Sequence, residues 1–143
     1  MLRATIEDIM TEHIVKIKAD ATINQAAHIL LRFRINGLLV VDENDEDKVV
    51  GVISTTDLLR LLDMALSRKI HRKEGLDKMS KMPVMKIART RVLRIQKKTK
   101  IEKLVALMDR KKMYTVPVYD GDKLVGVIGR HDILNAAFYA DDH

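Results

Sequence analysis

Apolar and polar positions follow the same order twice along this chain. Residues 49–59, VVGVISTTDLL, match residues 124–134, LVGVIGRHDIL, at an offset of 75. Further upstream the apolar positions match at an offset of 78, which places Ile23, Ala26, Ala27 and Leu30 on Ile101, Leu104, Val105 and Met108. The offset changes because DENDEDK (42–48) is three residues longer than DGDK (120–123), an insertion that hairpin tips tolerate. Such internal repetition indicates two copies of one structural unit.

Each copy predicts a β-α-β-β-α unit. Apolar residues at i, i+3, i+4 and i+7 predict helices over 22–34 and 100–112. Thr22 with Gln25, and Thr99 with Glu102, have the spacing of a capping box and predict both helix starts. Short apolar runs predict the strands, two of which form a hairpin in each copy: 14–17, 38–41 and 49–53, then 92–95, 116–119 and 124–128. The second helix of each copy is predicted to begin at Asp57 or Asp132. The helix that begins at Asp57 carries an apolar stripe of Leu58, Leu61, Leu62 and Ala65.

A connecting segment, residues 67–86, separates copy one (1–66) from copy two (87–143). Its basic helix is predicted to end at Gly75, and Pro83 prevents a helix from continuing into the second copy. One copy alone would leave a three-stranded sheet with an uncovered face. We therefore expect the two copies to pack about a pseudo-twofold axis as one α+β module with two related clefts.

The composition excludes several kinds of site. Without cysteine the chain has no disulfide, thiolate metal site or cysteine nucleophile. The five histidines, at 13, 28, 71, 131 and 143, show no metal-ligand spacing. No apolar run approaches the roughly 20 residues of a membrane span, and MLRATIEDIM lacks the apolar core of a signal peptide. We expect a cytoplasmic protein with no metal and no membrane partner.

Basic residues gather in the middle of the sequence. Residues 66–112 contain 17 Lys and Arg against 4 Asp and Glu, while the rest contains 9 against 16. Such a segment favours an anionic partner, and nucleic-acid binding is one interpretation. A solvated linker that balances an acidic surface is the other. With 3% aromatic residues and no tryptophan, a stacking platform for single-stranded nucleic acid is not expected.

The candidate chemistry lies where the last strand of each copy meets a helix, in GVISTTD (51–57) and GVIGRHD (126–132). A helix N-terminus offers unpaired N–H groups and a positive dipole end, both of which suit a phosphate. Asp57 and Asp132 can each accept two hydroxyls, as a ribose diol offers. Hydroxyl and charged donors for phosphate oxygens stand beside the acids: Ser54, Thr56, Arg130 and His131.

The same residues have a purely structural interpretation. Ser54 and Asp57 also have the spacing of a helix cap. Copy two has Gly129 in place of the serine yet keeps Asp132, which favours a shared ligand role, although an aspartate can stabilise a helix start unaided. A triad of Ser54, His131 and an aspartate lacks the nucleophile elbow and oxyanion loop of a hydrolase. We expect no enzyme and no catalytic cofactor.

The doubled junction, IMT (9–11), and the strands GLLVVD (37–42) and TVPVYD (115–120) resemble the cystathionine-β-synthase-type (CBS) domain. The two copies, over residues 6–138, resemble the tandem pair called a Bateman module. This resemblance implies a regulatory module that binds adenosine-containing ligands in the clefts between the copies. AMP, ADP, ATP and S-adenosylmethionine are the ligands implied.

The resemblance also implies roles for individual residues. Asp57 and Asp132 would hold the ribose, and Ser54, Arg130 and His131 would meet phosphates. The base pocket would be lined by residues of the first and second strands: Thr11, Val15, Leu39, Leu93 and Pro117. Gly129 replaces the family's hydroxyl, and Arg89 stands where copy one has Thr11, so we expect unequal sites. Arg130 and His131 beside Asp132 favour copy two for a ligand with several phosphates.

The partners implied are a small-molecule nucleotide, a second copy of the chain and a separate effector protein. Members of the family pair head-to-head or head-to-tail through their helices, which implies a homodimer. A ligand-free dimerisation scaffold is an alternative to the sensor. Nucleic-acid binding through residues 66–112 ranks well below the sensor, because the segment spans a linker, a strand and a helix.

Overall fold

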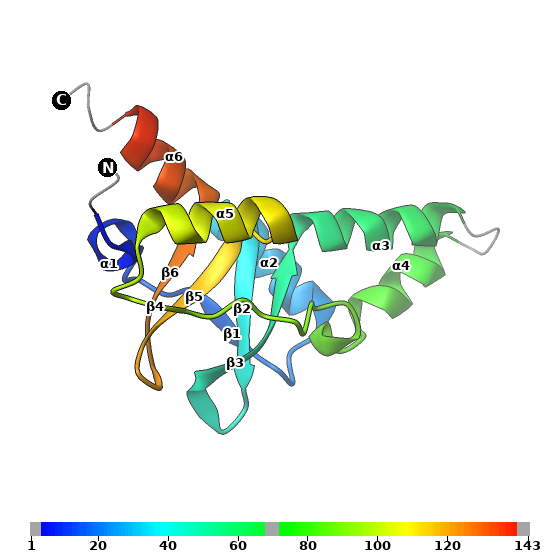
Figure 1. Cartoon of the computed structure of the whole chain (residues 1–143). Helices are drawn as coiled ribbons and strands as arrows, with labels where there is room; N and C mark the ends of the chain where they lie inside the picture. Colours follow the sequence, from blue (N-terminus) through cyan, green and yellow to red (C-terminus); the bar gives the residue numbers. More distant parts are fainter. Residues whose placement is uncertain (1–3, 68–71, 140–143) are drawn as a thin grey trace. The chain divides into compact units, whose positions relative to one another are not determined.

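Two three-stranded sheets carry the repeat in the computed structural model, which describes residues 4–67 and 72–139 (Figure 1). The elements, in chain order, are α1 (Ile6–Ile9), β1 (Lys16–Lys18), α2 (Ile23–Phe33), β2 (Gly37–Asp42), β3 (Asp45–Ser54), α3 (Thr55–Ser67), α4 (Arg72–Ser80), the 3₁₀ turn η1 (Val84–Lys86), β4 (Ile95–Gln96), α5 (Ile101–Lys111), β5 (Thr115–Asp120), β6 (Lys123–Gly129) and α6 (Arg130–Phe138). The strand orders are β1-β2-β3 and β4-β5-β6. In both sheets the first pair is parallel and the second is an antiparallel hairpin. The predicted α+β class and the repeated unit are confirmed.

The chain forms two compact units whose boundaries cross the repeat. The first unit contains residues 16–91, and the second contains the described residues of 1–15 and 92–143. Each unit therefore holds the sheet of one copy and the segment that precedes the sheet of the other copy. We call these two segments, 4–15 and 81–91, the leading segments. This division differs from the expected boundaries at 66 and 87.

Residues 4–15 lead into copy one but pack on the strands of copy two. The Ile6 N–H donates to the carbonyl of Thr99 at 3.0 Å. Thr11 and Val127 exchange two backbone hydrogen bonds, at 2.9 and 3.0 Å. Ile6 is fully buried in the core of the second unit, among side chains of β5, β6 and α5. The N-terminal segment is thus a structural part of the second unit.

The segment before copy two makes the equivalent contacts in the first unit. The Val84 N–H donates to the carbonyl of Ala21 at 2.8 Å, and Val84 is fully buried. Arg89 and Val52 exchange two backbone hydrogen bonds, at 2.8 and 2.9 Å. The repeat offset of 78 aligns Val84 with Ile6, Ala21 with Thr99 and Arg89 with Thr11, and the offset of 75 aligns Val52 with Val127. Each copy's leading segment therefore completes the other copy's sheet unit.

Two glycines give the leading segments room to approach. A Cβ on Gly51 would lie 3.2 Å from the carbonyl oxygen of Arg89. On the equivalent Gly126, it would lie 2.6 Å from the Met10 Sδ. A side chain at position 51 would press on the backbone of the leading segment, and one at position 126 would force the Met10 side chain to move. The glycine in each repeated GV sequence is therefore explained by packing.

The first helix of each copy buries three of the four apolar positions that the sequence predicts, while Ala27 is half-buried and Val105 is exposed. Ile23, Ala26 and Leu30 are buried on α2, and their counterparts Ile101, Leu104 and Met108 are buried on α5. Burial of each large aliphatic side chain stabilises the fold by about 1.5–3 kcal/mol.

The predicted capping box is confirmed at one helix and wrong at the other. Thr22 accepts from the Gln25 N–H at 3.2 Å, while the Gln25 Oε1 accepts from the Thr22 N–H at 2.9 Å. At α5 the N-cap is Lys100, one residue after Thr99, and its side chain makes no capping hydrogen bond. Thr99 instead lies in the turn that receives the N–H of Ile6.

Some element boundaries differ from the sequence predictions. β1 and β4 are short and start later than predicted, while α3 and α6 begin two residues before Asp57 and Asp132. Gly75 lies inside α4, so the predicted helix end there is wrong; α4 ends at Ser80, before Pro83. Residues 68–71 of the basic connection, like His143, lie outside the described residues. None of the helices in 4–67 and 72–139 combines the length and apolar character that crossing a membrane requires.

Candidate functional site

The candidate site of the first unit is built on Asp57, the third residue of α3. Its Oδ2 accepts hydrogen bonds from the backbone N–H of Ser54 at 2.8 Å and from the Ser54 hydroxyl at 2.9 Å. The Ser54 Oγ in turn accepts from the Asp57 N–H at 3.2 Å. This reciprocal arrangement is a capping box, which fixes the helix start against the end of β3. One carboxylate oxygen is thus committed to the fold.

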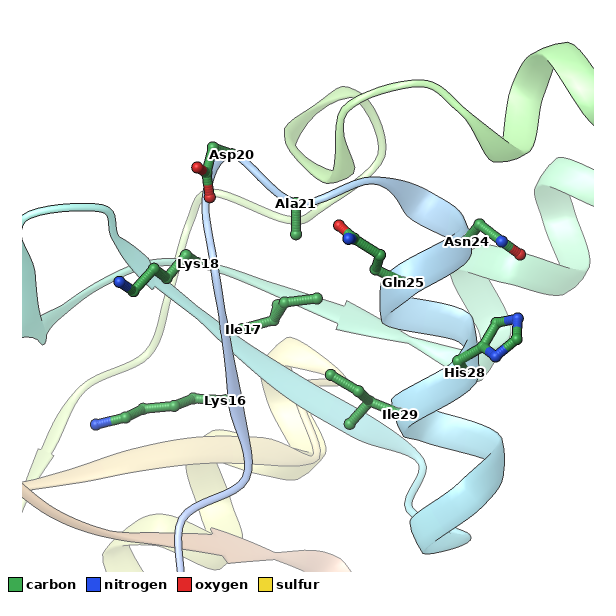
Figure 2. A pocket seen from close by; sticks show the side chains of 9 residues that line it. All are labelled: Lys16, Ile17, Lys18, Asp20, Ala21, Asn24, Gln25, His28 and Ile29. Atoms are coloured by element: carbon green, nitrogen blue, oxygen red, sulfur yellow. The ribbon is translucent and has the colours of Figure 1, made fainter.

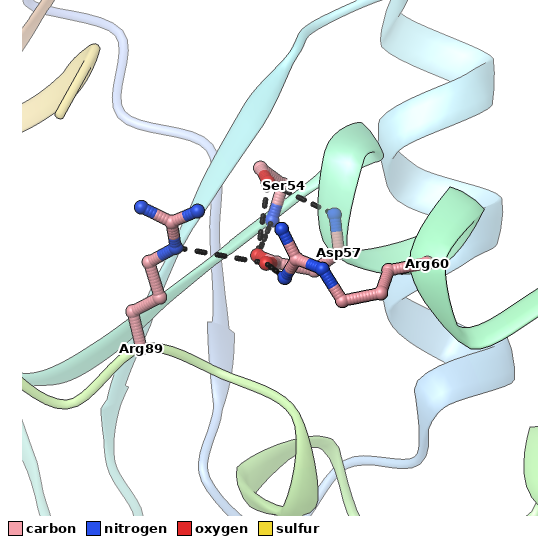
Figure 3. A network of polar contacts seen from close by, with 4 residues as sticks. All are labelled: Ser54, Asp57, Arg60 and Arg89. Atoms are coloured by element: carbon pink, nitrogen blue, oxygen red, sulfur yellow. Dashed lines mark hydrogen bonds and ion pairs between the residues drawn. The ribbon is translucent and has the colours of Figure 1, made fainter. Parts of the chain in front are cut away.

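The other oxygen of Asp57 faces two arginines (Figure 3). The Arg60 Nη1 lies 3.4 Å from Oδ1, and the Arg89 Nε lies 3.6 Å from it. The Asp57 side chain is 4% exposed, whereas the side chains of Arg60 and Arg89 are 60% and 43% exposed. A buried carboxylate needs such partners, because removing them would leave its charge uncompensated. The guanidinium groups meanwhile stay accessible to an anion from solvent.

Asp132 repeats the division of the carboxylate in the second unit. Its Oδ2 accepts from the backbone N–H of Gly129 at 2.8 Å. Its Oδ1 accepts from the Thr11 hydroxyl at 3.2 Å. In both units, then, Oδ2 caps the helix and Oδ1 faces a residue of the leading segment.

This geometry corrects one inference from the sequence. The glycine at 129 was expected to leave Asp132 without a capping partner, and the retained acid therefore favoured a ligand role. The Gly129 backbone N–H supplies that partner, so the cap requires no hydroxyl. The ligand hypothesis instead depends on Oδ1, the oxygen that the cap does not use.

The predicted site residues are divided between the units. The first unit holds Ser54, Thr56 and Leu39, and the second holds Val15, Leu93, Pro117, Arg130, His131 and Thr11. Thr11 lies against Asp132 because the leading segments are exchanged. Leu39 pairs with Val52, the bridge partner of Arg89, and Pro117 pairs with Val127, the bridge partner of Thr11.

Three arginines at the junctions have contacts that the sequence did not predict. Arg130 lies over the ring of Tyr114, with the guanidinium carbon 4.5 Å from the ring centroid. Arg130 is exposed, and this cation–π contact gives its guanidinium a partner within the chain. Arg60 and Arg89 contact the acid but were not among the predicted site residues. The repeat offers a signal for both, since Arg89 aligns with Thr11 and Arg60 lies one turn after Asp57.

A pocket of about 800 Å³ lies between β1 and α2 in the first unit (Figure 2). Ile17 and Ile29 point toward each other across it, while Lys16 and Lys18 point to the other side of the strand. Its lining contains none of the predicted site residues. It forms beside the edge strand of the sheet, where the sequence gives no signal of a cavity.

The remaining polar chemistry is structural. Glu7 of α1 pairs with Lys97 and Lys98, which ties the leading segment to the turn before α5. The hydrogen bond and charge of Glu7 raise the pKa of the Lys98 amine above its ordinary value. In 4–67 and 72–139, no group of three or more His, Cys, Asp or Glu side chains is placed to hold a metal ion.

Comparison with known proteins identifies the family. The model of the CBS domain matches residues 6–63 and 84–139, one match for each copy. The chain belongs to the CBS domain family. Both matches begin in the leading segments, at Ile6 and Val84, the residues that are buried in the other copy's unit. The resemblance to a tandem CBS pair is confirmed.

CBS relatives occur in proteins of very different size. The chain is 28% identical over 130 residues to the A-adding tRNA nucleotidyltransferase of Geobacter sulfurreducens, covering 91% of this chain and 13% of that enzyme. It is 28% identical over 152 residues to the CBS domain-containing protein CBSX1, chloroplastic, of Arabidopsis thaliana, covering 93% of this chain and 64% of CBSX1. The chain thus spans less than two thirds of either relative. CBS pairs therefore form a small part of some enzymes and the larger part of other proteins.

A solved CBS structure matches over nearly the whole chain. CBSX2, solved in complex with AMP, superposes with a TM-score of 0.75 at 28% identity. The match covers 96% of this chain and 98% of the CBSX2 chain.

The capping role of Ser54 is testable. We expect Ser54→Ala to lower the free energy of unfolding by about 0.5–2 kcal/mol, because both hydrogen bonds of the hydroxyl are lost while the backbone bond to Asp57 remains. Urea unfolding followed by circular dichroism measures the change. Thr56→Ala, at an exposed position of the same turn, is the matched control. Equal losses in the two variants would contradict the assignment.

Proposed function

We propose that this chain is a regulatory CBS pair that binds adenosine-containing nucleotides at the Asp57 and Asp132 junctions. The observation that carries the proposal is the carboxylate oxygen Oδ1, which the helix cap leaves available at both junctions. The likeness to CBSX2, a protein solved with AMP bound, supports an adenine nucleotide as the ligand class.

The proposed contacts follow from the chemistry of the junction. A ribose hydroxyl donates to Oδ1 of the aspartate, and this charge-assisted bond orients the sugar. The helix N-terminus places its dipole and its first-turn donors, including the exposed Thr56 hydroxyl, on the phosphate side. The leading segment supplies the remaining contact, through Arg89 in the first unit and Thr11 in the second.

The proposed action is a shift between conformations rather than catalysis. A bound nucleotide changes the populations of two arrangements only by its differential affinity for them. We call Oδ1, the oxygen that the helix cap does not use, the outer oxygen. It pairs with arginines at Asp57 and with a threonine hydroxyl at Asp132, and neither arrangement activates a nucleophile. A separate effector protein would sense the change. The tRNA nucleotidyltransferase lends no activity to this proposal, because the chain covers only 13% of it.

Two alternatives receive less support from the structure. For the nucleic-acid site, the basic residues of 66–112 belong to two compact units that divide at residue 91, so neither unit carries them all. A ligand-free scaffold would explain the two arginines as charge partners of Asp57, but the likeness to CBSX2, solved in complex with AMP, favours a ligand site.

A second copy of the chain is the partner that we propose for α3. Leu59, Leu62 and Leu66 are 67%, 38% and 44% exposed, and their i, i+3, i+7 spacing places them on one helix face. Leu62 belongs to the apolar stripe that the sequence predicts for this helix, of which Ala65 is buried. An apolar helix face of this kind is suited to packing against its own copy around a twofold axis.

The ribose contact predicts a loss of affinity when both acids are neutralised. We expect the double variant Asp57→Asn/Asp132→Asn to bind AMP roughly 5- to 30-fold more weakly, because an amide NH2 replaces the outer carboxylate oxygen and cannot accept the charge-assisted hydrogen bond of the ribose hydroxyl. Asparagine keeps an oxygen for the helix cap, so the fold is preserved. Titration calorimetry compares this variant with Asp63→Asn, an exposed change of the same charge on α3. Unchanged affinity in the double variant would refute the proposed function.

The dimer proposal predicts dissociation when α3 is made polar. We expect Leu59→Asp/Leu66→Asp to be monomeric at concentrations where the wild type is dimeric, because two charges would be buried without partners. Sedimentation equilibrium measures the mass. Leu31→Asp, on the exposed side of α2, should leave the dimer intact. A monomeric wild type, or a dimeric double variant, would be inconsistent with this interface.

A further inference from the structure

The residue that faces the outer oxygen of the acid differs between the two units. Arg89 and Thr11 occupy equivalent backbone positions, since each exchanges two hydrogen bonds with the equivalent strand residue, Val52 or Val127. The side chain at this position is a guanidinium 3.6 Å from Oδ1 of Asp57 in one unit. In the other it is a hydroxyl 3.2 Å from Oδ1 of Asp132.

A second position changes in the same direction. Arg60 lies one helical turn after Asp57, with Nη1 3.4 Å from the same Oδ1. At the repeat offset of 75, copy two has Asn135 at this position. Both cations that face the outer oxygen in the first unit are therefore replaced by neutral residues in the second.

The two arginines impose a condition on any ligand of the first unit. A ribose hydroxyl that takes Oδ1 must separate both guanidinium groups from a carboxylate whose side chain is 4% exposed. A phosphorylated ligand offers these cations an oxyanion in exchange. An uncharged nucleoside offers them nothing, so its binding leaves the cations unpaired, which is a penalty against that ligand class.

The second unit imposes no such condition. A ligand hydroxyl that binds Oδ1 of Asp132 takes the place of the Thr11 hydroxyl. One neutral donor then replaces another, so no cation loses its partner. Arg130, the cation that the sequence assigned to phosphate here, lies over the Tyr114 ring. The contacts therefore favour the first unit for the anionic ligand, whereas the sequence favoured copy two.

We propose that the two junctions sort adenosine-containing ligands by charge, with Arg89 and Thr11 as the specificity-determining residues. The Asp57 junction selects phosphorylated ligands over the free nucleoside, and the Asp132 junction accepts both. This inference rests on the proposed nucleotide-binding function. It adds that the two sites of the pair report on chemically different ligands.

Each junction can be tested by weakening ligand binding at the other with an Asp→Asn substitution. In the Asp132→Asn background, which leaves the Asp57 junction, we expect AMP to bind at least tenfold more tightly than adenosine. Adding Arg89→Thr should lower this AMP-to-adenosine ratio by about tenfold, the effect of losing one charge-assisted contact. Arg91→Thr removes the same charge from an exposed position two residues along and should leave the ratio unchanged.

The reverse exchange tests the second junction. In the Asp57→Asn background we expect similar affinities for AMP and adenosine, and Thr11→Arg should raise the ratio by about tenfold. Titration calorimetry supplies all of these ratios. If AMP and adenosine bind but Arg89→Thr and Thr11→Arg leave the ratios unchanged, the sorting is refuted while the proposed function stands. If neither ligand binds the wild-type chain, the proposed function fails and the sorting fails with it.

Discussion

The backbone pairing of each leading segment with the other copy's last strand is the constraint on which the candidate sites depend. Arg89 pairs with Val52, and Thr11 pairs with Val127, through two hydrogen bonds each. Gly51 and Gly126 leave room for this pairing, and the burial of Val84 and Ile6 anchors it. It places a side chain from outside the repeat copy against the acid at the helix start. The two copies are consequently complete only in each other's presence.

In the proposed site, one oxygen of each aspartate serves the fold and the other serves recognition of the ligand. Oδ2 caps α3 or α6 through a backbone N–H, a contact that any helix start can use. Oδ1 faces the leading segment, and its surroundings differ between the units because Arg89 and Thr11 differ. Under our proposal, the duplicated fold retains one scaffold, and the residues that face Oδ1 change its ligand preference.

Much of the fold could be predicted from the sequence, because it depends on local periodicity and repetition. The stripes that begin at Ile23 and Ile101 fixed α2 and α5, and the repeated GVI sequences located the last strands. The exchange of Thr11 and Arg89 could not be predicted, since it is a long-range pairing that leaves no periodic pattern. The helix cap at Gly129 could not be predicted either, because its donor is a backbone N–H, which every residue except proline carries. The repeat offset nevertheless held the signal for Arg89, which aligns with Thr11.

The central claim is that the outer oxygen of the junction aspartate receives the sugar of an adenine nucleotide. A crystal structure of this chain grown with AMP tests it most directly. The account predicts a ribose hydroxyl within hydrogen-bond distance of Oδ1 of Asp57 or Asp132, with the phosphate toward the helix N-terminus. AMP bound elsewhere, for example in the pocket between β1 and α2, with both carboxylates still in their ligand-free contacts, would contradict it.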